Sequence, residues 1–476
     1  MKNYKNTWLY KYKHIPDTAH GFPTCMYVIS LEAWRRGLKV KFNMKRRKSI
    51  MTGLSYSISN GEKEHLFYGS RGDLTTREAN RICADKGQTI RNLKAANVSV
   101  PEGKDFPSET PIEELLDYAE KLGYPLVLKP STGGGGGGVG VVTNIKTTEE
   151  MKDNIIRLKE LKPKSSLIIE RFFVGEDFRV NVFNGKVIGA FHRRAQSVIG
   201  DGKHTLKELL RIKNKERNAS PFLATSKIKM DKKMKAFLAG KDITPEFVPA
   251  EGERIYLRRN GEFFGQRDAI NVTDNLSPKI KNIAVEAVNA IPGLSIGGVD
   301  MLIDLEKNEG IVNEVNSLPQ ISNHIFPIEG NAIDIPRIII DSYFPETRYE
   351  ELKNTHYYYD FKPIIENFRN GTAQEVTLPP IPTGKYIAKK YSVSGENFSK
   401  RYFEKMKKEA ATFSINGFIK IIDDNNLVIT ISSKKNNLEK FQRLIKTPPF
   451  RFVKINNVQE KSYNGPIKVG FEIKHK

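Results

Sequence analysis

Apolar positions near the start of the chain follow a helical spacing and then an alternating one. Within residues 23–36 they recur about every three or four residues, which predicts a helix that Gly37 ends. Residues 38–42 then alternate apolar and polar, as a strand does. We therefore expect a small α/β unit at this end.

Helices and short strands interleave through the middle of the chain. The pattern predicts helical segments at 75–96, interrupted near Gly87, at 111–122, at 205–213 and at 277–290. Predicted strands or extended stretches are 98–101, 125–129, 167–170, 297–304 and 311–315, with a hairpin of 178–183 and 186–191 across Asn184-Gly185. The basic stretch 227–241 is interpreted as a helix with a solvated surface.

Residues 346–382 lack clear periodicity and end in Leu378-Pro379-Pro380-Ile381-Pro382, which indicates a stiff linker. Beyond it, strand and helix patterns follow in the order βαββαβ, with one extra strand at the end. This is the order of a ferredoxin-like sandwich. The predicted domains are 1–84 (α/β), 85–345, the linker 346–382, and 383–476 (α+β).

The net charge of +22 is concentrated at the two ends of the chain. Residues 1–100 carry 19 Lys and Arg against 7 Asp and Glu, and residues 381–476 carry 20 against 8. Residues 101–380 carry 38 against 40. A role in binding nucleic acid, if there is one, would belong to the ends.

Composition excludes several classes of protein. With 39% apolar and 28% charged residues the chain is typical of a globular protein of several domains. No run reaches the ~20 apolar residues of a membrane span, and the first residues lack the apolar block of a signal peptide. Cys25 and Cys83 suit neither a disulfide framework nor a zinc site. We expect a cytoplasmic protein with two reduced thiols and no membrane partner.

Six consecutive glycines, Gly133, Gly134, Gly135, Gly136, Gly137 and Gly138, follow the strand 125–129. Glycines allow backbone amides to approach an anion closely. No Gly-Lys-Ser/Thr follows, so this is not a Walker loop. A flexible linker is the alternative, but the run lies between the apolar strand that ends in Lys129 and the apolar stretch 139–142. We interpret it as a loop that covers a polyphosphate.

The strands 297–304 and 311–315 predict a second site. If Asp304 faces Gly310 across the turn, Asp300 faces Glu314, and the period of two places Asn316 on the same face. Buried carboxylates need a compensating cation, and oxygen ligands suit Mg²⁺ bound to phosphates. The alternative is a solvated polar hairpin face.

A third candidate site follows the strand 167–170. Glu170 ends this strand, and Asp177 follows seven residues later, after Gly175. Carboxylates at this spacing could hold a base edge and a ribose. The spacing alone does not separate this interpretation from an ordinary polar turn.

Several motifs in register resemble the ATP-grasp superfamily, within it the ligase region of cyanophycin synthetase and bifunctional glutathione synthetase. They extend from about residue 85 to residue 345 and comprise Asp85-Lys86 with Thr89, YPLVLKPSTGGGGGGVGV, LIIERFFVGEDFRV, FHRRAQSVIGDGKHTLKELL, GGVDMLI, NEVNSLPQISNHIFPIEG and DSYFPE. The resemblance implies an ATP-grasp fold for 85–345. It also implies an ATP-dependent ligase that forms an amide through an acyl phosphate.

The resemblance also implies roles for single residues. Lys86 and Lys129 would contact the ATP phosphates under the lid Gly133–Gly138, with Glu170 and Phe172 or Phe173 beside adenine and Asp177 at the ribose. Asp300, Glu314 and Asn316 would hold two Mg²⁺ ions, which Mn²⁺ could replace. The residues implied at the acyl phosphate, the substrate carboxylate or the acceptor are Arg193, Arg258 and His324. Lys129, Arg193 and Arg258 would be the catalytic groups.

The sequence departs from this family in two places. Residues 262–267 read EFFGQR where cyanophycin synthetases have an N-x-S-x-G-G pattern, so the substrate pocket should differ. Residues 383–476 resemble acylphosphatase through YSVSG and NGFIKIIDD, but the loop from Gly395 to Arg401 has no further glycine and Ile421 replaces an expected asparagine. We expect an inactive acylphosphatase-like domain that could bind an anionic substrate, carrier or nucleic acid. The alternative is a plain solvated basic surface.

The sequence thus predicts an ATP-grasp carboxylate–amine ligase that acts on an amino acid, a peptide or a peptide-like product. Its partners would be ATP, Mg²⁺ and small or peptide carboxylates and amines. Two alternatives stay open: a nucleic-acid or ribosome-associated ATP-binding protein, and a ligase that adds residues to the terminus of a protein. A homo-oligomer also stays open.

Overall fold

The computed structural model describes residues 12, 14–45, 53–131, 140–258, 267–348 and 356–475. The chain divides into two compact units. The first contains residues 66–339 with 1–13 and 20–26, and the second contains 14–19, 27–65 and 340–476. The predicted glycine loop 133–138 lies outside the described residues, as do residues 262–266.

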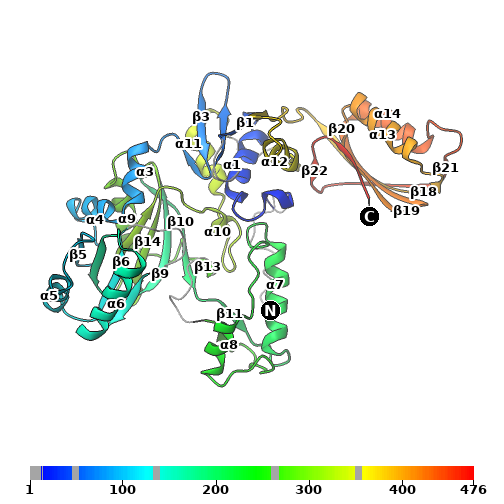
Figure 1. Ribbon diagram of the computed structural model, residues 1–476. Helices are drawn as coiled ribbons and strands as arrows, with labels where there is room; N and C mark the ends of the chain where they lie inside the picture. Colours follow the sequence, from blue (N-terminus) through cyan, green and yellow to red (C-terminus); the bar gives the residue numbers. More distant parts are fainter. Residues whose placement is uncertain are drawn as a thin grey trace. The chain divides into compact units, whose positions relative to one another are not determined.

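The first unit contains a four-stranded antiparallel sheet (Figure 1). Helices α5 (Ile112–Leu122) and α6 (Thr148–Leu161) pack against it through residues such as Leu115 and Ile155, which are wholly buried with the strands' apolar side chains. The strands, in sheet order, are β5 (Gly103–Phe106), β8 (Leu167–Arg171), β6 (Leu126–Pro130) and β7 (Val142–Ile145).

A five-stranded antiparallel sheet forms the centre of this unit. Its strands, in sheet order, are β13 (Asp268–Asn271), β10 (Lys186–Arg194), β9 (Glu176–Phe183), β14 (Ile296–Asp304) and β15 (Glu309–Asn316). One face carries Val180, Val299 and Met301 and is covered by α9 (Pro278–Asn289). Because side chains alternate along a strand, the opposite face receives the polar residues of β9, β10, β14 and β15.

The helical pattern at 75–96 breaks two residues earlier than expected. Helix α3 (Arg77–Ala84) ends and α4 (Lys86–Ala95) begins at Asp85, whose side chain accepts a hydrogen bond from the N–H of Gln88. The expected interruption near Gly87 is confirmed, and it lies at Asp85 because the capping carboxylate starts a new helix that includes Gly87. This start places Lys86 in the first turn of α4.

A smaller cluster of the first unit contains α7 (Leu206–Ala219), α8 (Lys232–Ala239) and the paired strands β11 (Ser197–Ile199) and β12 (Arg254–Tyr256). Helix α8 lies within the stretch 227–241, which we expected to be solvated surface. Its lysines are exposed, but Met234 and Leu238 are buried. The basic stretch is thus an amphipathic helix with one apolar side in a core. The unit ends with α10 (Ser322–Ile325) and most of α11 (Ile335–Tyr343).

The second unit contains α1 (Thr24–Arg35), most of which belongs to it, with the antiparallel strands β17 (Glu375–Thr377), β1 (Lys39–Met44) and β2 (Leu54–Ser59). Strand β3 (Glu64–Tyr68) carries the chain into the first unit, where β4 (Arg71–Gly72) follows. Segment 346–382, expected to be a linker, also contains β16 (Tyr357–Tyr358) and α12 (Lys362–Arg369). Its described part, from residue 356 onward, packs into a core through the buried side chains of Tyr357, Phe361 and Ile364.

The last part of the second unit has the element order βαββαβ, followed by short strands (Figure 1). Its five-stranded sheet has the order β21-β18-β20-β19-β23. The elements, in chain order, are β18 (Tyr386–Glu396), α13 (Lys400–Thr412), β19 (Asn416–Asp423), β20 (Asn426–Lys434), α14 (Lys435–Lys446), β21 (Lys454–Ser462), β22 (Ile467–Lys468) and β23 (Phe471–Lys474). An acylphosphatase-like identity for this part stays a prediction.

Among the described residues, no helix is both long enough and apolar enough to cross a bilayer.

Residues Val428 and Ile429 test which face of the C-terminal sheet is buried. Ile429 lies wholly inside the core, whereas Val428 is half-buried on the other face of β20. Ile429→Ala should cost about 2–5 kcal/mol because it leaves a cavity, and Val428→Ala should cost less than about 1 kcal/mol. Hydrogen exchange of peptides from 386–474 in the full chain measures this difference. Equal deprotection by the two variants would contradict the assignment of faces.

Candidate active site

Lys129 and Glu170 form a buried ion pair between neighbouring strands. Lys129 lies on β6 and Glu170 on β8, and Nζ of Lys129 is 2.6 Å from Oε2 of Glu170. Each side chain is only 4% exposed. Buried ions need a partner of opposite charge. The pair therefore holds an ammonium group at the end of β6, directly before the glycine run.

The hairpin of β14 and β15 places Asp300 opposite Glu314 and Gly298 opposite Asn316. The predicted Asp300–Glu314 pairing is confirmed. The predicted pairing of Asp304 with Gly310 is wrong, because Asp304 pairs with Glu309 and the register shifts at Met301. The physical reason is a β-bulge, in which an extra residue of one strand has no partner on the other.

Asn313 is that extra residue, since Val312 pairs with Met301 and Glu314 with Asp300. Its Oδ1 atom accepts a hydrogen bond from Nζ of Lys129 at 3.1 Å. Lys86, in the first turn of α4, has its Nζ atom 3.7 Å from Oε2 of Glu314. Lys129 and Lys86, which we expected to bind phosphate, thus contact consecutive residues of β15. The expected metal ligands Glu314 and Asn316 lie on the same strand.

Asp300 is held by two arginines. The guanidinium of Arg179, on β9, donates through Nε and Nη2 to the two carboxylate oxygens of Asp300, and Nη2 of Arg193, on β10, lies 2.8 Å from Oδ1. Burial disfavours the charged carboxylate, but the two guanidinium groups outweigh it and lower the pKa of Asp300 below its ordinary value. Asp300 is therefore an anion at neutral pH.

Gly298 leaves room for the guanidinium of Arg179. A Cβ atom at this position would lie 2.8 Å from Nη1 of Arg179 and 3.0 Å from Cβ of Pro319. Arg179 was not among the residues predicted from the sequence. Arg179 could have been recognised by its place on the strand next to the one that carries Asp300. That place is known only once the strand order of the sheet is known.

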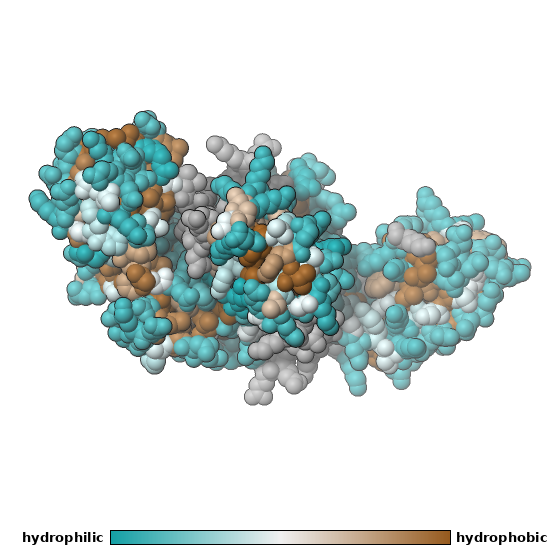
Figure 2. Space-filling view, turned by 90° about the horizontal axis from the view of Figure 1, so that it is seen from below, coloured by the Kyte–Doolittle hydropathy of each residue, from teal (hydrophilic) through white to brown (hydrophobic). Residues whose placement is uncertain are grey.

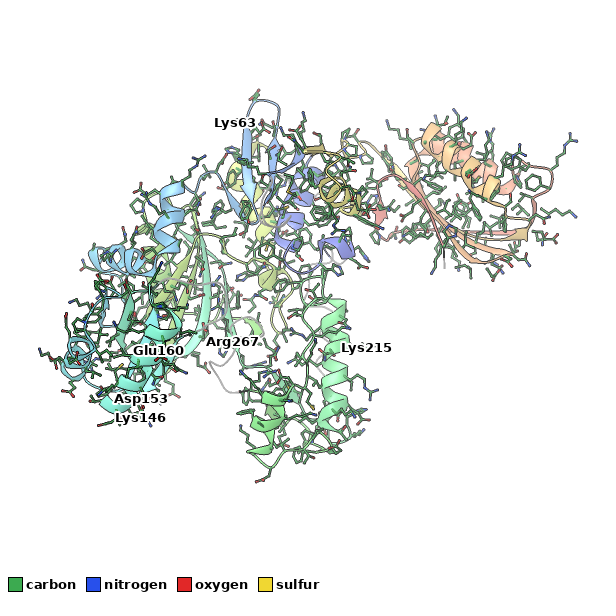
Figure 3. The ribbon with its side chains drawn as sticks, viewed as in Figure 1. Lys63, Lys146, Asp153, Glu160, Lys215 and Arg267 are labelled. Carbon is green, nitrogen blue, oxygen red and sulfur yellow. The ribbon has the colours of Figure 1, made fainter. Side chains whose placement is uncertain are left out.

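Asp177 belongs to the same charged cluster. It is 3.4 Å from Nη1 of Arg193 and also pairs with Arg267, which is labelled in Figure 3 and precedes β13. Burial raises the pKa of Asp177 above its ordinary value, and the arginines only partly offset this effect. In this structure the carboxylate expected at the ribose contacts arginines on the sheet face.

Asn316 lies between the two carboxylates. Its amide is 3.3 Å from Oδ2 of Asp300, and with the amide turned over it is 3.2 Å from Oε1 of Glu314. The described residues contain no group of three His, Cys, Asp or Glu that could hold a metal. Two carboxylates and an amide nevertheless fit Mg²⁺, which typically takes one or two carboxylates and completes its shell with phosphate oxygens and water.

The structure does not bring every predicted residue into this cluster. Arg258 pairs with Asp231, the N-cap of α8, at 2.6 Å. Phe172 and Phe173 follow β8 and are half-buried, and the N–H of Phe172 donates to the carbonyl of Pro125 at 3.0 Å. Glu170 is beside Lys129, as described. The expected lid, Gly133–Gly138, lies outside the described residues.

His324 and Asn181 are buried polar side chains at the edge of the cluster. Both are 0% exposed, and among the described residues their side-chain nitrogen and oxygen atoms have no hydrogen-bond partner. Asn181 pairs with Gly189 and Gly298 on its neighbouring strands. A Cβ at Gly189 would lie 2.6 Å from Nδ1 of His324, so glycine lets α10 approach β10. Unpaired buried polar atoms are costly and suit a site that a polar ligand or water completes.

Comparisons with known proteins agree with this geometry. Residues 85–178 match the family described as carbamoyl-phosphate synthase L chain, ATP binding domain. The glutathione biosynthesis bifunctional protein GshAB of Clostridium perfringens is 31% identical over 328 residues, which are 67% of this chain and 40% of that protein. Cyanophycin synthetase of Crocosphaera subtropica is 32% identical over 272 residues, 56% of this chain and 30% of that protein.

The matched part of the chain is similar to the ATP-grasp ligase regions of these relatives. The fold of this chain is mixed α/β, and ATP-grasp enzymes use ATP and Mg²⁺. Among solved structures, a bifunctional glutathione synthetase from Pasteurella multocida is 22% identical, with a TM-score of 0.49, over 61% of this chain and 40% of that one. The chain spans less than half the length of the two curated relatives.

Single and double variants of the buried ion pair measure the coupling energy between Lys129 and Glu170. Lys129→Met should cost about 3–5 kcal/mol of unfolding free energy because it leaves a buried carboxylate unpaired. Adding Glu170→Gln should recover part of this loss. The exposed pair Arg171–Glu102, at 2.9 Å, is the control, and Arg171→Met should cost less than about 1 kcal/mol. Urea denaturation of Lys129→Met, Glu170→Gln, the double variant and Arg171→Met measures this, and additive losses at 129 and 170 would contradict it.

Burial lowers the pKa of His324 to about 3. The unfolded imidazole binds a proton below about pH 6.5, so the folded state should lose up to about 1.4 kcal/mol for each pH unit between 6.5 and 3. This stability is fully present above pH ~6.5. His324→Phe should flatten the dependence of unfolding free energy on pH between about 7 and 5, whatever its effect at neutral pH. An unchanged slope in denaturation curves would contradict the buried neutral imidazole.

Proposed function

We propose that the chain is an ATP-dependent carboxylate–amine ligase that forms an amide through an acyl phosphate. One observation carries the proposal: two lysines contact neighbouring residues of β15. Lys129 contacts Asn313, and Lys86 contacts Glu314, which pairs with Asp300 across the hairpin. Cations that suit phosphate and oxygens that suit Mg²⁺ therefore lie at one place. The match to an ATP binding domain over residues 85–178 supports the assignment of the nucleotide to this place.

The nucleotide would lie between the two sheets of the first unit. In this proposal Lys86 and Lys129 bind phosphate oxygens, and the glycines 133–138 close over them with backbone amides. Glu170 then has two roles: it orients the ammonium of Lys129 and offers a carboxylate oxygen to the base. Phe172 or Phe173 would pack on adenine, with Asp177 at the ribose.

In the first step an oxygen of the substrate carboxylate attacks the γ-phosphorus, and the bond to the β,γ-bridging oxygen breaks. ADP leaves and an acyl phosphate forms. In the second step an amine attacks the acyl carbon, inorganic phosphate leaves, and the nitrogen loses a proton. Neither step needs a protein nucleophile, so catalysis consists of positioning and charge stabilisation.

Arg193 is the better placed of the two proposed catalytic arginines, because it reaches Asp300 and Asp177 from β10. We propose that it and Arg179 stabilise negative charge on the acyl phosphate. Arg258 and His324 would contact the substrates. Asp300, Glu314 and Asn316 would hold Mg²⁺, which when bound neutralises phosphate charge.

Substrates are proposed by class. The relatives are named for the biosynthesis of glutathione and the synthesis of cyanophycin, and ATP-grasp ligases of this kind act on amino acids and peptides. We infer an amino-acid or peptide carboxylate as donor and an amine as acceptor. The C-terminal domain, which we propose to be ferredoxin-like, would add to this function rather than hydrolyse acyl phosphates.

Glu314 tests the proposal. Purified protein with Mg²⁺-ATP, pooled amino acids and dipeptides, and hydroxylamine as trap should form ADP and a hydroxamate. Glu314→Ala should lower this rate at least about a hundredfold, because it removes a carboxylate that we propose as a ligand of the Mg²⁺ at the ATP phosphates. Glu309→Ala is the control, since Glu309 lies on the same strand and is exposed. An ADP rate that does not depend on carboxylate, or equal losses in both variants, would contradict the proposal.

A further inference from the structure

The C-terminal sheet has one face in a core with α13 and α14, and no helix of the described part of the chain covers its other face (Figure 1). Tyr391, Val393, Ile419 and Ile429 are buried with α13 and α14. Alternate residues of the same strands therefore point to the other side of the sheet. Among the described residues, Tyr357 covers one end of this second face, where its hydroxyl is 2.6 Å from that of Ser432.

Two pairs of lysines face each other across strands on this open face. Lys390 of β18 pairs with Lys461 of β21, and Lys420 of β19 pairs with Lys474 of β23. Like charges directly opposite each other destabilise a sheet. A fold that retains two such pairs on one face carries a local excess of positive charge that an anion would relieve.

Three of these lysines lack a compensating carboxylate. Among the described residues, Lys390, Lys420 and Lys461 form no ion pair and are exposed. Lys474 is 3.0 Å from Glu472, and its ammonium also lies over the ring of Phe418, 4.2 Å from the centroid. The open face thus presents unpaired ammonium groups on β21, β18 and β19 rather than a balanced polar surface.

The centre of the open face is partly apolar. Phe418 and Val428 are half-buried and belong to this side, and Thr430 lies between Lys390 and Phe418 in the sheet. In Figure 2 the C-terminal part, on the right, shows a hydrophobic patch within a hydrophilic border. An apolar centre with a basic border is suited to a peptide whose acidic side chains reach the lysines.

We propose that this open face binds an acidic peptide, rich in Glu or Asp, and thereby holds a carboxylate-bearing substrate on the enzyme. The inference rests on the proposed ligase function and specifies its substrate. An acidic peptide fits better than a single-stranded nucleic acid, because stacking needs exposed rings. The ring of Phe418 is half-buried and covered by Lys474.

The test is direct binding of fluorescein-labelled oligo-glutamate to the full chain, followed by anisotropy at low salt. Lys390→Glu with Lys420→Glu should weaken binding at least about tenfold, and Lys390→Arg with Lys420→Arg should retain it. Lys407→Glu with Lys408→Glu is the matched control: it makes the same change in net charge on α13, where both lysines are exposed. The control should stay within about twofold of the unaltered protein.

Equal weakening by the two glutamate variants would overturn the proposal, because it would show attraction by net charge alone. Oligo-dT that binds more tightly than oligo-glutamate, and is lost in the Lys390/Lys420 variant, would overturn it in favour of nucleic acid. The hydroxylamine assay with pooled small carboxylates separates this inference from the ligase proposal. Full hydroxamate formation without oligo-glutamate binding refutes the docking face alone, and binding without hydroxamate refutes the ligase alone.

Discussion

The burial of Asp300 on the five-stranded sheet constrains the rest of the site. A carboxylate in this position is costly unless cations compensate it. Arg179 and Arg193 supply that compensation from the two strands beyond β14, and Gly298 leaves the space that Arg179 needs. The result is one sheet face whose charges are ordered before any nucleotide arrives, which favours electrostatic catalysis over covalent catalysis.

The bulge at Asn313 connects this face to the rest of the first unit. It restores the pairing of Asp300 with Glu314 and turns the amide of Asn313 toward Lys129. Lys86 reaches Glu314 from a helix whose start is fixed by the cap at Asp85. Charged side chains from a second sheet and from a helix, Lys129 and Lys86, therefore contact consecutive residues of one strand. This explains how motifs far apart in the sequence form one site.

Local patterns predicted many of the strands and helices, because apolar periodicity and turn residues are properties of short segments. They did not predict α6 or the strands β2 and β3. The alternation along 297–304 and 311–316 gave the facing carboxylates even though the turn register was off by one residue. Arg179, Asn313 and Asn181 could not be found in this way, since their roles depend on which strands are neighbours. The helix within the expected linker 346–382 was missed, although Phe361, Ile364 and Phe368 recur at the three- or four-residue spacing of a helix with one buried face.

Positional isotope exchange in ATP tests the central claim most directly. ATP labelled with ¹⁸O in the β,γ-bridge is incubated with the enzyme, Mg²⁺ and pooled amino acids and dipeptides, with no trap present. Reversible transfer of the γ-phosphate to a carboxylate should move label from the bridge to the β-nonbridging positions, and only when carboxylates are present. Label that stays in the bridge under all conditions, or moves equally without carboxylate, would contradict an acyl-phosphate ligase.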